Sequence, residues 1–511
     1  MKRLWRVLFS RITLSLLMIV FEVALLVLLF IFTPRSVYIV VGASLILSFL
    51  CFLSLVNRDV NPEYKITWLS LILILPPVGA ILYLIFYSRR LSRREGRLYL
   101  GIAKELRARG IDGEPLSELY SISTLAAGKA RAILSDDPLA SVYGGTSSRV
   151  FSEGSALFSS MLEDLASAKK FIFLEYFIID EGELWDGILD MLKRKVSEGV
   201  EVRVLYDDFG CFKTLPEDYD EQLRALGINA HIVARITPRV SSVHNNRDHR
   251  KICVIDGRIA YTGGVNIADE YADLKERFGH WKDGGIRMEG RAVAGFIKLF
   301  LATFDVAARV VSDYDRYLSE VGDADEPDGG FYIPFGSGPA PIYRRPVGKN
   351  LFLNLINQAE KYLYITTPYL IIDYDLTEAL RNAASRGVEV RIITPGIADK
   401  KRIKVMTKSA YPYLMEGGVK IFEYTPGFIH EKMLVSDGKY AVIGTVNFDY
   451  RSLAHHYECG VWIFNSKVVE DARLAFLETV SSSAEVTRKS SRLTLGEWLV
   501  KIRIRLFNPL L

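Results

Sequence analysis

The stretch HRKICVIDG at residues 249–257 occurs a second time, as HEKMLVSDG at residues 430–438. Each copy has a His, a Lys two residues later and an Asp-Gly pair after four more residues. Each copy then runs on to a pair of small residues and an Asn, Asn266 or Asn447, at the same offset from its His. A spaced pattern of this length is hard to match twice by chance, so we interpret the copies as two halves of one active site.

Each copy of the motif predicts a β-hairpin, because its Asp-Gly pair separates two apolar runs. Residues two apart on a strand point to the same face. We therefore expect His249 and Lys251 to lie together, and His430 and Lys432 likewise. The Asp of each copy sits at the turn, away from that pair.

Two imidazoles and two ammonium groups converge if two such hairpins pack with approximate two-fold symmetry. They would form a site for an anion with several oxygens, and phosphate is the obvious candidate. One imidazole can attack phosphorus while the other protonates the leaving oxygen, because the pKa of imidazole lies near neutrality. A metal site is the alternative, but a neighbouring Lys repels a cation. We expect no metal and no cofactor.

Each His also needs an acceptor that orients its second ring nitrogen. Asp283 and Glu458 lie at broadly similar offsets after their motifs, and each precedes a short strand-like run. We interpret them as the orienting carboxylates. An ordinary buried ion pair is the alternative for both.

The repeat extends beyond the motif to a whole strand–helix–strand unit, which is typical of a parallel βαβ pair. The first unit is predicted at residues 170–179, 185–196 and 199–206, and the second at 361–372, 376–385 and 387–394. The second strand of each unit is nearly identical, GVEVRVLY against GVEVRIIT. The sequence therefore predicts an α/β protein built by internal duplication, with two lobes.

The expected organisation has five parts. They are an N-terminal membrane segment (1–97), a connector (98–145), a first lobe (146–325), a second lobe (326–490) and a basic, apolar tail (491–511). The join between lobes falls in residues 322–339, which are rich in Asp, Gly and Pro. The tail is expected either in the membrane interface or docked as a helix on the domain.

Three apolar stretches open the chain, at residues 13–33, 36–56 and 66–87. Each is long enough to cross a hydrocarbon layer of about 30 Å, and half of all residues are hydrophobic. A buried helical hairpin of a soluble protein is the alternative. Pro76-Pro77 interrupts the third stretch, so that stretch is also compatible with a re-entrant or interfacial segment.

Arginines and lysines flank the apolar stretches on both sides, and the positive-inside rule places both clusters in the cytoplasm. This requires an even number of crossings. The number is even if one of the three stretches does not span. The third stretch is broken by its prolines, and the first contains Glu22, a carboxylate that is costly at mid-bilayer. We expect a multi-pass protein of the cell membrane with a cytoplasmic catalytic domain. The four unpatterned cysteines are compatible with a reducing compartment.

The two motifs resemble the phospholipase D superfamily over residues 146–485. Together with the apolar stretches, the segments NPEYK (61–65), GGVNIADEY (263–271) and NFDYRS (447–452) are similar to bacterial cardiolipin synthases. The resemblance implies two α/β/α lobes with mixed sheets that share one site without a metal. It implies transfer of a phosphatidyl group from one phosphatidylglycerol to another, with release of glycerol.

The resemblance also implies roles for single residues. His249 would be the nucleophile, and His430 the general acid and later the base. Four residues would bind the phosphate: Lys251, Lys432, Asn266 and Asn447. Asp256 and Asp437 would be largely structural members of the catalytic motif. The pair His455-His456 departs from the family pattern, in which an Asn often precedes the Glu.

Two other functions are compatible with the same motifs: hydrolysis, by a phospholipase D or a nuclease, and a membrane scaffold without activity. A net charge of only +4 argues against a nucleic-acid partner, and two intact motifs argue against the scaffold. The expected partners are phosphatidylglycerol, cardiolipin and the lipid bilayer. A homo-oligomer is left open.

Overall fold

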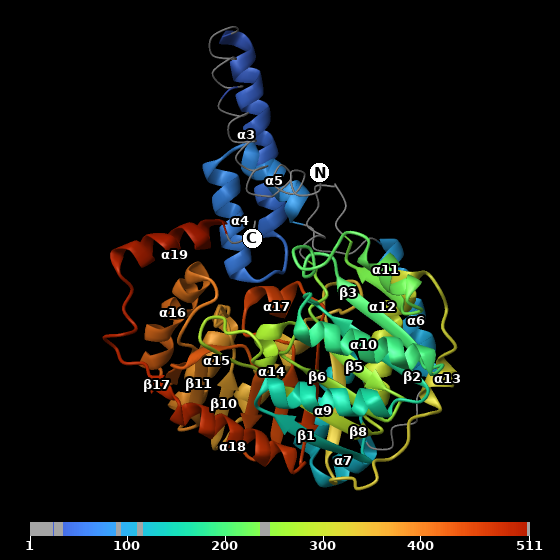
Figure 1. The fold of residues 1–511 in the computed structure, drawn as a ribbon. Coiled ribbons are helices and arrows are strands. Elements are labelled where there is room, and N and C mark those ends of the chain that lie inside the picture. The colour runs from blue at the N-terminus through green and yellow to red at the C-terminus, as the bar shows by residue number, and fades with distance from the viewer. Residues whose placement is uncertain (1–23, 25–33, 88–92, 110–115, 236–245, 508–511) are drawn as a thin grey trace. The chain divides into compact units, whose positions relative to one another are not determined.

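The computed structural model describes residue 24 and residues 34–87, 93–109, 116–235 and 246–507. The chain divides into two compact units (Figure 1). One unit contains residues 1–89, 236–244 and 493–511, and the other contains residues 90–235 and 245–492.

The smaller unit contains the apolar helices. Its described elements are α3 (Pro34–Val56), α4 (Pro62–Ile74), α5 (Val78–Phe86) and α19 (Leu495–Phe507), and α19 contacts α4. Among the described residues, one segment, Tyr38–Val56 of α3, is long and apolar enough to cross a membrane. The predicted stretch 13–33 lies outside the described residues apart from Ala24.

The third apolar stretch is two helices, not one, because the chain breaks at residues 75–77, where two prolines lack the N–H that a continuing helix needs. Helices of 13 and 9 residues span about 20 and 14 Å, less than the hydrocarbon layer. They pack closely: a Cβ on Gly79 would lie 2.0 Å from the Leu71 carbonyl oxygen, and the Trp68 and Tyr83 rings are 5.7 Å apart. The stretch is a packed hairpin rather than one spanning helix.

The larger unit begins with α6 (Arg93–Ala108), α7 (Leu116–Ile122) and α8 (Thr124–Asp136), in the region expected to be a connector. Their apolar side chains, including Tyr99, Leu106 and Leu119, are buried in the main hydrophobic core.

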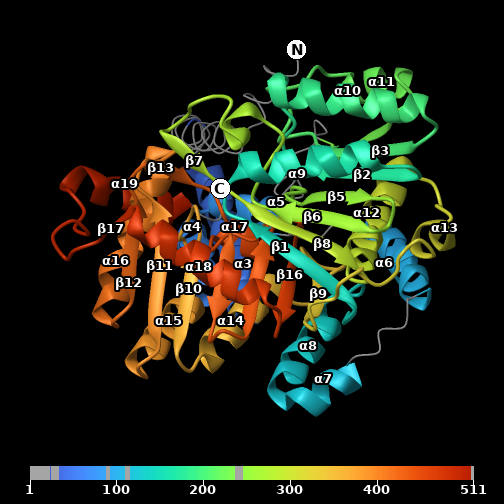
Figure 2. The ribbon, with the colours of Figure 1, turned by 60° about the horizontal axis from the view of Figure 1, so that its bottom comes forward.

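Two mixed sheets follow (Figures 1 and 2). The first has the order β1-β8-β6-β5-β2-β3-β4. Its strands are β1 (Thr146–Phe151), β2 (Phe171–Tyr176), β3 (Glu201–Asp207), β4 (Asn229–Val233), β5 (Lys251–Ile255), β6 (Ile259–Gly263) and β8 (Gly285–Gly290). Its helices are α9 (Gly154–Ser167), α10 (Glu183–Ser197), α11 (Tyr219–Ala225), α12 (Val293–Ala308) and α13 (Tyr314–Leu318), with a 3₁₀ turn at Asp269–Ala272.

The second sheet has the order β17-β12-β11-β10-β14-β15-β16-β9. Its strands are β9 (Phe331–Ser337), β10 (Tyr362–Thr366), β11 (Glu389–Pro395), β12 (Lys420–Tyr424), β14 (Met433–Ser436), β15 (Tyr440–Gly444), β16 (Glu458–Phe464) and β17 (Ser483–Glu485). Its helices are α14 (Val347–Gln358), α15 (Tyr374–Ser385), α16 (Lys401–Glu416), α17 (Tyr450–Ala454) and α18 (Val468–Ser481).

The two sheets repeat one local topology. β2 pairs in parallel with β3, and β10 with β11. The strand of the first motif, β5, is antiparallel to β2, and that of the second motif, β14, is antiparallel to β10. Helices cover both faces of the first sheet: α9 and α10 on one, and α12, whose Phe300 stacks on Phe173 at 4.5 Å, on the other. The predicted fold class, α/β with two mixed-sheet lobes, is confirmed.

The lobes share one continuous hydrophobic core, in which α12 packs against β9 of the second sheet. A Cβ on Gly295 of α12 would lie 2.6 Å from Pro334, so a larger residue would separate the two elements. Two backbone pairings also cross between the lobes. The short strands β7 (His280–Lys282) and β13 (Gly427–Ile429) are parallel, and Asp248 bridges to Tyr457.

The motif aspartates occupy the hairpin turns and bind the backbone of the strand next to them. Asp256 accepts from the N–H groups of residues 169, 170 and 171 at 2.7–2.8 Å. Asp437 accepts from residues 360, 361 and 362 at 2.8–3.1 Å. Both aspartates have positive φ, near 55°, which Asp tolerates better than most residues. Each therefore ties the motif hairpin to the start of β2 or β10.

We predict that Asp256→Ala lowers the free energy of unfolding by about 1–3 kcal/mol, because three backbone N–H groups lose a charged acceptor and alanine is strained at positive φ. Urea titration of the detergent-solubilised protein measures this change in the free energy of unfolding. Asp256→Asn keeps an acceptor oxygen and should lose less. The control is Asp190→Ala, since Asp190 is exposed on α10 and pairs with Lys193 alone among the described residues. Equal stability of Asp256→Ala and the control would contradict this role.

Candidate active site

His249 lies two residues before β5, not on the strand as expected, and is held by the second lobe. Its backbone N–H donates to the Tyr457 carbonyl at 2.8 Å, and the Tyr457 N–H donates to the Arg247 carbonyl at 2.8 Å. The next residue of the second lobe is Glu458, the first of β16. Its Oε2 accepts from Nδ1 of His249 at 2.9 Å.

His430 lies between β13 and β14, and the first lobe holds it in the same way. Its backbone N–H donates to the Lys282 carbonyl at 2.7 Å, at the end of the β7–β13 pairing. The next residue is Asp283, whose Oδ2 accepts from Nδ1 of His430 at 2.7 Å. Each histidine is thus oriented by the carboxylate of the other lobe.

Both carboxylates are fully buried, with no exposed surface. A buried carboxylate that accepts a hydrogen bond from Nδ1 fixes the orientation of the ring and places the proton of the neutral imidazole on Nδ1. Nε2 of each imidazole then carries a lone pair, which suits one ring for attack and the other for proton transfer.

The two carboxylates differ in length, and their surroundings compensate. Glu458 accepts also from the hydroxyl of Thr445 and, at 2.6 Å, from that of Ser452. The position that corresponds to Thr445 in the first motif is Gly264, where a Cβ would lie 2.0 Å from Oδ1 of Asp283 and 2.8 Å from the His430 carbonyl oxygen. The shorter Asp283 therefore reaches His430 only because Gly264 leaves room.

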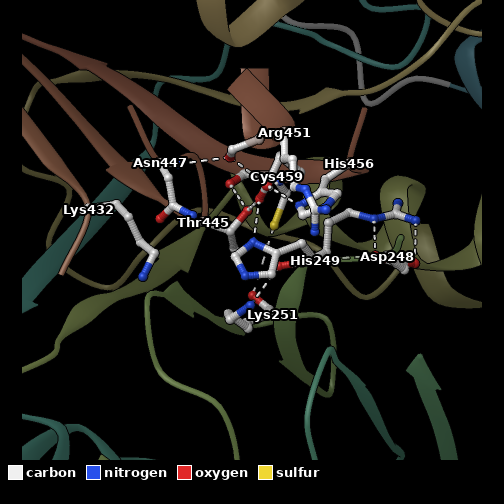
Figure 3. Close-up of polar contacts among 12 residues, drawn as sticks. Asp248, His249, Lys251, Lys432, Thr445, Asn447, Arg451, His456 and Cys459 are labelled. Atoms are coloured by element: carbon white, nitrogen blue, oxygen red, sulfur yellow. Dashed lines mark hydrogen bonds and ion pairs between the residues drawn. The ribbon is translucent and has the colours of Figure 1, made fainter. Parts of the chain in front are cut away.

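Figure 3 shows the polar contacts around His249, which lead to Lys251 in the same motif and to Thr445 in the other lobe. The lysine Nζ atoms lie close to the histidine backbones. Lys251 donates to the His249 carbonyl at 2.7 Å, and Lys432 donates to the His430 carbonyl and lies 2.8 Å from its Nδ1.

Burial lowers the pKa of both lysines: that of Lys251 to about 8 and that of Lys432 to about 7. Glu458 and Asp283 oppose this effect, and the charge of Lys251 adds to the lowering at Lys432. Two ammonium groups in one buried site repel each other, and an anion bound between them would relieve that repulsion.

Both histidines have a lowered pKa, which favours the neutral imidazole. Burial first, and then the charge of Lys251, lowers the pKa of His249 to about 3, against the opposing pull of Glu458. Burial and the charges of Lys432, Lys251 and Lys400 hold the pKa of His430 well below its usual value. Lys251 acts on both imidazoles, so the two half-sites share one electrostatic environment.

The two asparagines predicted to bind phosphate differ in their contacts. Asn266 accepts from the Ile178 N–H at 3.1 Å and donates to the Tyr271 hydroxyl at 2.8 Å. The buried side-chain oxygen of Asn447 has no hydrogen-bond partner in the described part of the chain. Tyr271, which sequence reasoning gave no role, also packs edge-on against the His430 ring at 5.5 Å.

The structure brings eight of the ten predicted site residues together: both histidines, both lysines, both asparagines and both orienting carboxylates. It places Asp256 and Asp437 at the hairpin turns, on backbone N–H groups, so their part in the motif is architectural.

A buried ion cluster beneath His249 was missed by sequence reasoning. Arg250 is fully buried and contacts Asp248 at 2.8 Å and Glu175 at 3.1 Å. The cluster flanks His249 on both sides in sequence and so fixes the backbone from which that ring projects. The signal available was the charged residue between the His and the Lys of the motif, just before β5, where the second copy has Glu431.

His456 lies beside the first half-site. Its ring centroid is 5.5 Å from that of His249, and its Nδ1 is 3.5 Å from Oε1 of Glu458. These three residues place ligand-type atoms within 4.8 Å of one another. A cation bound through Nδ1 would have to displace the proton that His249 donates to Glu458, and it would be repelled by the charge of Lys251. We therefore keep the expectation of a metal-independent reaction.

Comparisons with known proteins agree with this geometry. The family model described as "Cardiolipin synthase, PLD-like domain" matches residues 161–276 and 352–479, and "Phospholipase_D-nuclease N-terminal" matches residues 46–86. A protein of Streptococcus mutans described as uncharacterized is 40% identical over 90% of this chain and 99% of its own length. A cardiolipin synthase of Halalkalibacterium halodurans is 31% identical over 88% of this chain and 90% of its own.

Among solved structures, the phosphatidylserine synthase of Haemophilus influenzae superimposes with a TM-score of 0.54. It has 15% sequence identity and covers 71% of this chain and 92% of its own. This likeness supports the fold.

We predict that sulfate binds the lysine pair and that its affinity falls at least tenfold as the pH rises from about 6 to 9. A lowered lysine pKa means that the ammonium charge is lost at lower pH than usual, here through about 7 and 8, whereas sulfate stays dianionic throughout. Calorimetric titration of the purified protein measures the affinity at each pH.

The matched variant is Lys432→Arg, whose guanidinium stays charged and should flatten the pH dependence. Lys432→Met should weaken binding at every pH. An affinity of the unchanged protein that is constant over this range would contradict the lowered pKa values.

Proposed function

The chain belongs to the cardiolipin synthases of the phospholipase D superfamily, and we propose that it makes cardiolipin and glycerol from two phosphatidylglycerol molecules. The phosphatidyl group is carried on His249 between the two steps of the transfer. The enzyme is a phospholipid phosphatidyltransferase. The observation that carries the finer proposal is the pair of cross-lobe His–carboxylate bonds, each flanked by a lysine.

In the first step the phosphodiester of one phosphatidylglycerol lies between Lys251 and Lys432, which neutralise its charge. Nε2 of His249 forms a bond to phosphorus, and the bond from phosphorus to the headgroup glycerol oxygen breaks. His430 gives a proton to that oxygen, and glycerol leaves.

In the second step His430, now neutral, takes the proton of a hydroxyl on the second phosphatidylglycerol. That oxygen bonds to phosphorus as the bond to Nε2 of His249 breaks. Cardiolipin is released, and both histidines return to their initial states. Atoms and protons balance over the two steps.

His430 must hold two protons when the first step begins, although the empty site keeps it neutral. The bound phosphodiester supplies the difference, because a negative charge beside an imidazole raises its pKa. Substrate binding therefore favours the doubly protonated form of His430, which can act as the acid. Asp283 stabilises this imidazolium through Nδ1.

Aromatic rings surround the histidines and favour a lipid alcohol over water as the acceptor. Phe177 packs against His249 at 5.0 Å, and Tyr271, Trp281 and Phe428 pack against His430 at 5.5–5.9 Å. These walls exclude water from the covalent intermediate. They also support phospholipid, rather than nucleic acid, as the substrate class.

Membrane association follows from the family and from the apolar helix α3. We propose in addition a multi-pass topology with the catalytic lobes in the cytoplasm, because basic residues flank the apolar segment on both sides. The packed α4–α5 hairpin supports an even number of crossings, since neither helix is long enough to span.

We predict that the purified protein, incubated with phosphatidylglycerol in detergent, yields cardiolipin and glycerol in equal amounts. His249→Ala should abolish turnover and the covalent retention of radiolabelled phosphatidyl groups. His430→Ala should slow turnover strongly yet still trap label on His249. Phosphatidic acid as the main product would indicate hydrolysis, and absence of turnover would indicate a scaffold. Label retained on His249→Ala but lost from His430→Ala would reverse the two histidines.

We predict that Glu458→Gln lowers kcat by about 10²–10⁴-fold with a small change in KM, because the amide can accept at one atom only and cannot stabilise the imidazolium-like charge that develops on His249. Steady-state kinetics on phosphatidylglycerol micelles test this. Glu478→Gln on α18 is a control, since its side chain lies outside the site described above. A loss confined to KM would contradict an orienting role for Glu458.

A further inference from the structure

A second group of ligand-type side chains lies on the first lobe, outside the catalytic residues: Glu153, Asp273 and His280. Glu153 directly precedes α9, Asp273 follows the 3₁₀ turn at Asp269–Ala272, and His280 begins β7. Nε2 of His280 lies 3.5 Å from Oε2 of Glu153 and 3.7 Å from Oδ1 of Asp273. Their side chains are 36–38% exposed, so the group lies at the surface of the lobe.

Each of the three side chains is fixed through its other polar atom. Oε1 of Glu153 accepts from Lys282 at 3.0 Å, and Oδ2 of Asp273 accepts from Ser155 at 3.0 Å. Nδ1 of His280 lies 2.7 Å from the Tyr424 hydroxyl. If Nδ1–H donates to that hydroxyl, the lone pair of Nε2 is directed at the two carboxylates.

The atoms left over, Oε2, Oδ1 and Nε2, face one another. Oε2 of Glu153 is buried and has no hydrogen-bond partner in the described part of the chain. Second contacts that orient ligands while leaving their coordinating atoms open are typical of metal sites. Two oxygens and one nitrogen that converge in this way are suited to a divalent cation.

The spacing of these atoms fits a transition-metal ion. In a tetrahedral site with bonds of 2.0–2.1 Å, neighbouring ligand atoms are about 3.3 Å apart. The two distances to Nε2 of His280, 3.5 and 3.7 Å, need only a small contraction, and the two carboxylate oxygens lie within 4.8 Å of each other. One imidazole with two carboxylates suits Zn²⁺ or Mn²⁺, whereas a set of oxygens alone would favour Mg²⁺ or Ca²⁺.

We propose that Glu153, Asp273 and His280 bind a divalent transition-metal ion of the Zn²⁺ or Mn²⁺ class, which braces the contact between the lobes. Two carboxylates balance its charge, with Lys282 offsetting part of theirs. The ion takes no part in the transfer reaction. Its effect is on the strand β7, which pairs with β13 and whose Lys282 carbonyl accepts from the His430 N–H.

The position of the site explains what an ion would do there. His280 is tied to Tyr424 of the second lobe, and Asp283 follows three residues later. Fixing His280 fixes the strand that presents Asp283 to His430. The alternative is an ion pair between His280 and the two carboxylates, which needs no metal ion.

Binding of Mn²⁺ alone tests the proposal without reference to activity. The full-length protein in detergent is stripped with a chelator, desalted and titrated with Mn²⁺, and the free ion is followed by electron paramagnetic resonance. We expect one saturable site per chain, displaced by Zn²⁺. His280→Asn and Glu153→Gln should each weaken it at least tenfold, and Tyr424→Phe less. Loaded protein should also melt several degrees higher, a shift that His280→Asn removes.

The matched control is His231→Asn, because His231 contacts Asn229 at 3.1 Å and belongs to neither group of ligand-type side chains. It should bind Mn²⁺ as the unchanged protein does. Asp273→Asn is the second ligand variant should His280→Asn fail to fold, since Asp273 has a φ of 59° that Asn tolerates. Absence of saturable binding, or equal affinity in the ligand variants and the control, would overturn the proposal.

Discussion

A hydrogen bond links the imidazole of each motif to a buried carboxylate of the opposite lobe. It joins His249 to Glu458 and His430 to Asp283, and neither lobe can form a complete half-site alone. The shared core around α12 and β9, the β7–β13 pairing and the bridge between Asp248 and Tyr457 all hold the lobes in the register that these bonds require. Duplication thus produced one site rather than two.

Burial gives these bonds their chemical effect. Two carboxylates without exposed surface fix the Nδ1 protons, and two lysines with lowered pKa values leave a site that an anion stabilises. Burial and the lysine charges lower the pKa of both imidazoles, which favours their neutral form. In the proposed mechanism the nucleophile is therefore neutral, and the acid becomes charged when a phosphodiester binds. Aromatic rings pack against both histidines, and in the proposed mechanism they shield the covalent intermediate from water.

Much of this was predictable from the repeated motif: the hairpins, the parallel strand pairs, the two lobes and the histidines, lysines and asparagines of the site. The exchange of carboxylates was not predictable, because Asp283 and Glu458 each follow their own motif in sequence. Only the packing of the lobes shows that each carboxylate binds the histidine of the other lobe. The same holds for the Arg250 cluster and for Gly264, whose missing side chain makes room for Asp283. Local patterns predict strands and turns, whereas contacts between residues about 150–200 positions apart depend on the tertiary fold.

Nitrogen-15 NMR of histidine-labelled protein, with signals assigned by His249→Gln and His430→Gln, tests the exchanged carboxylates most directly. We expect both catalytic rings to be neutral at pH 7, protonated on Nδ1 and bare on Nε2. Glu458→Gln should alter the His249 signals and spare those of His430, and Asp283→Asn should do the reverse. Rings protonated on Nε2, or a Glu458 variant that disturbs His430 instead, would contradict the cross-lobe arrangement.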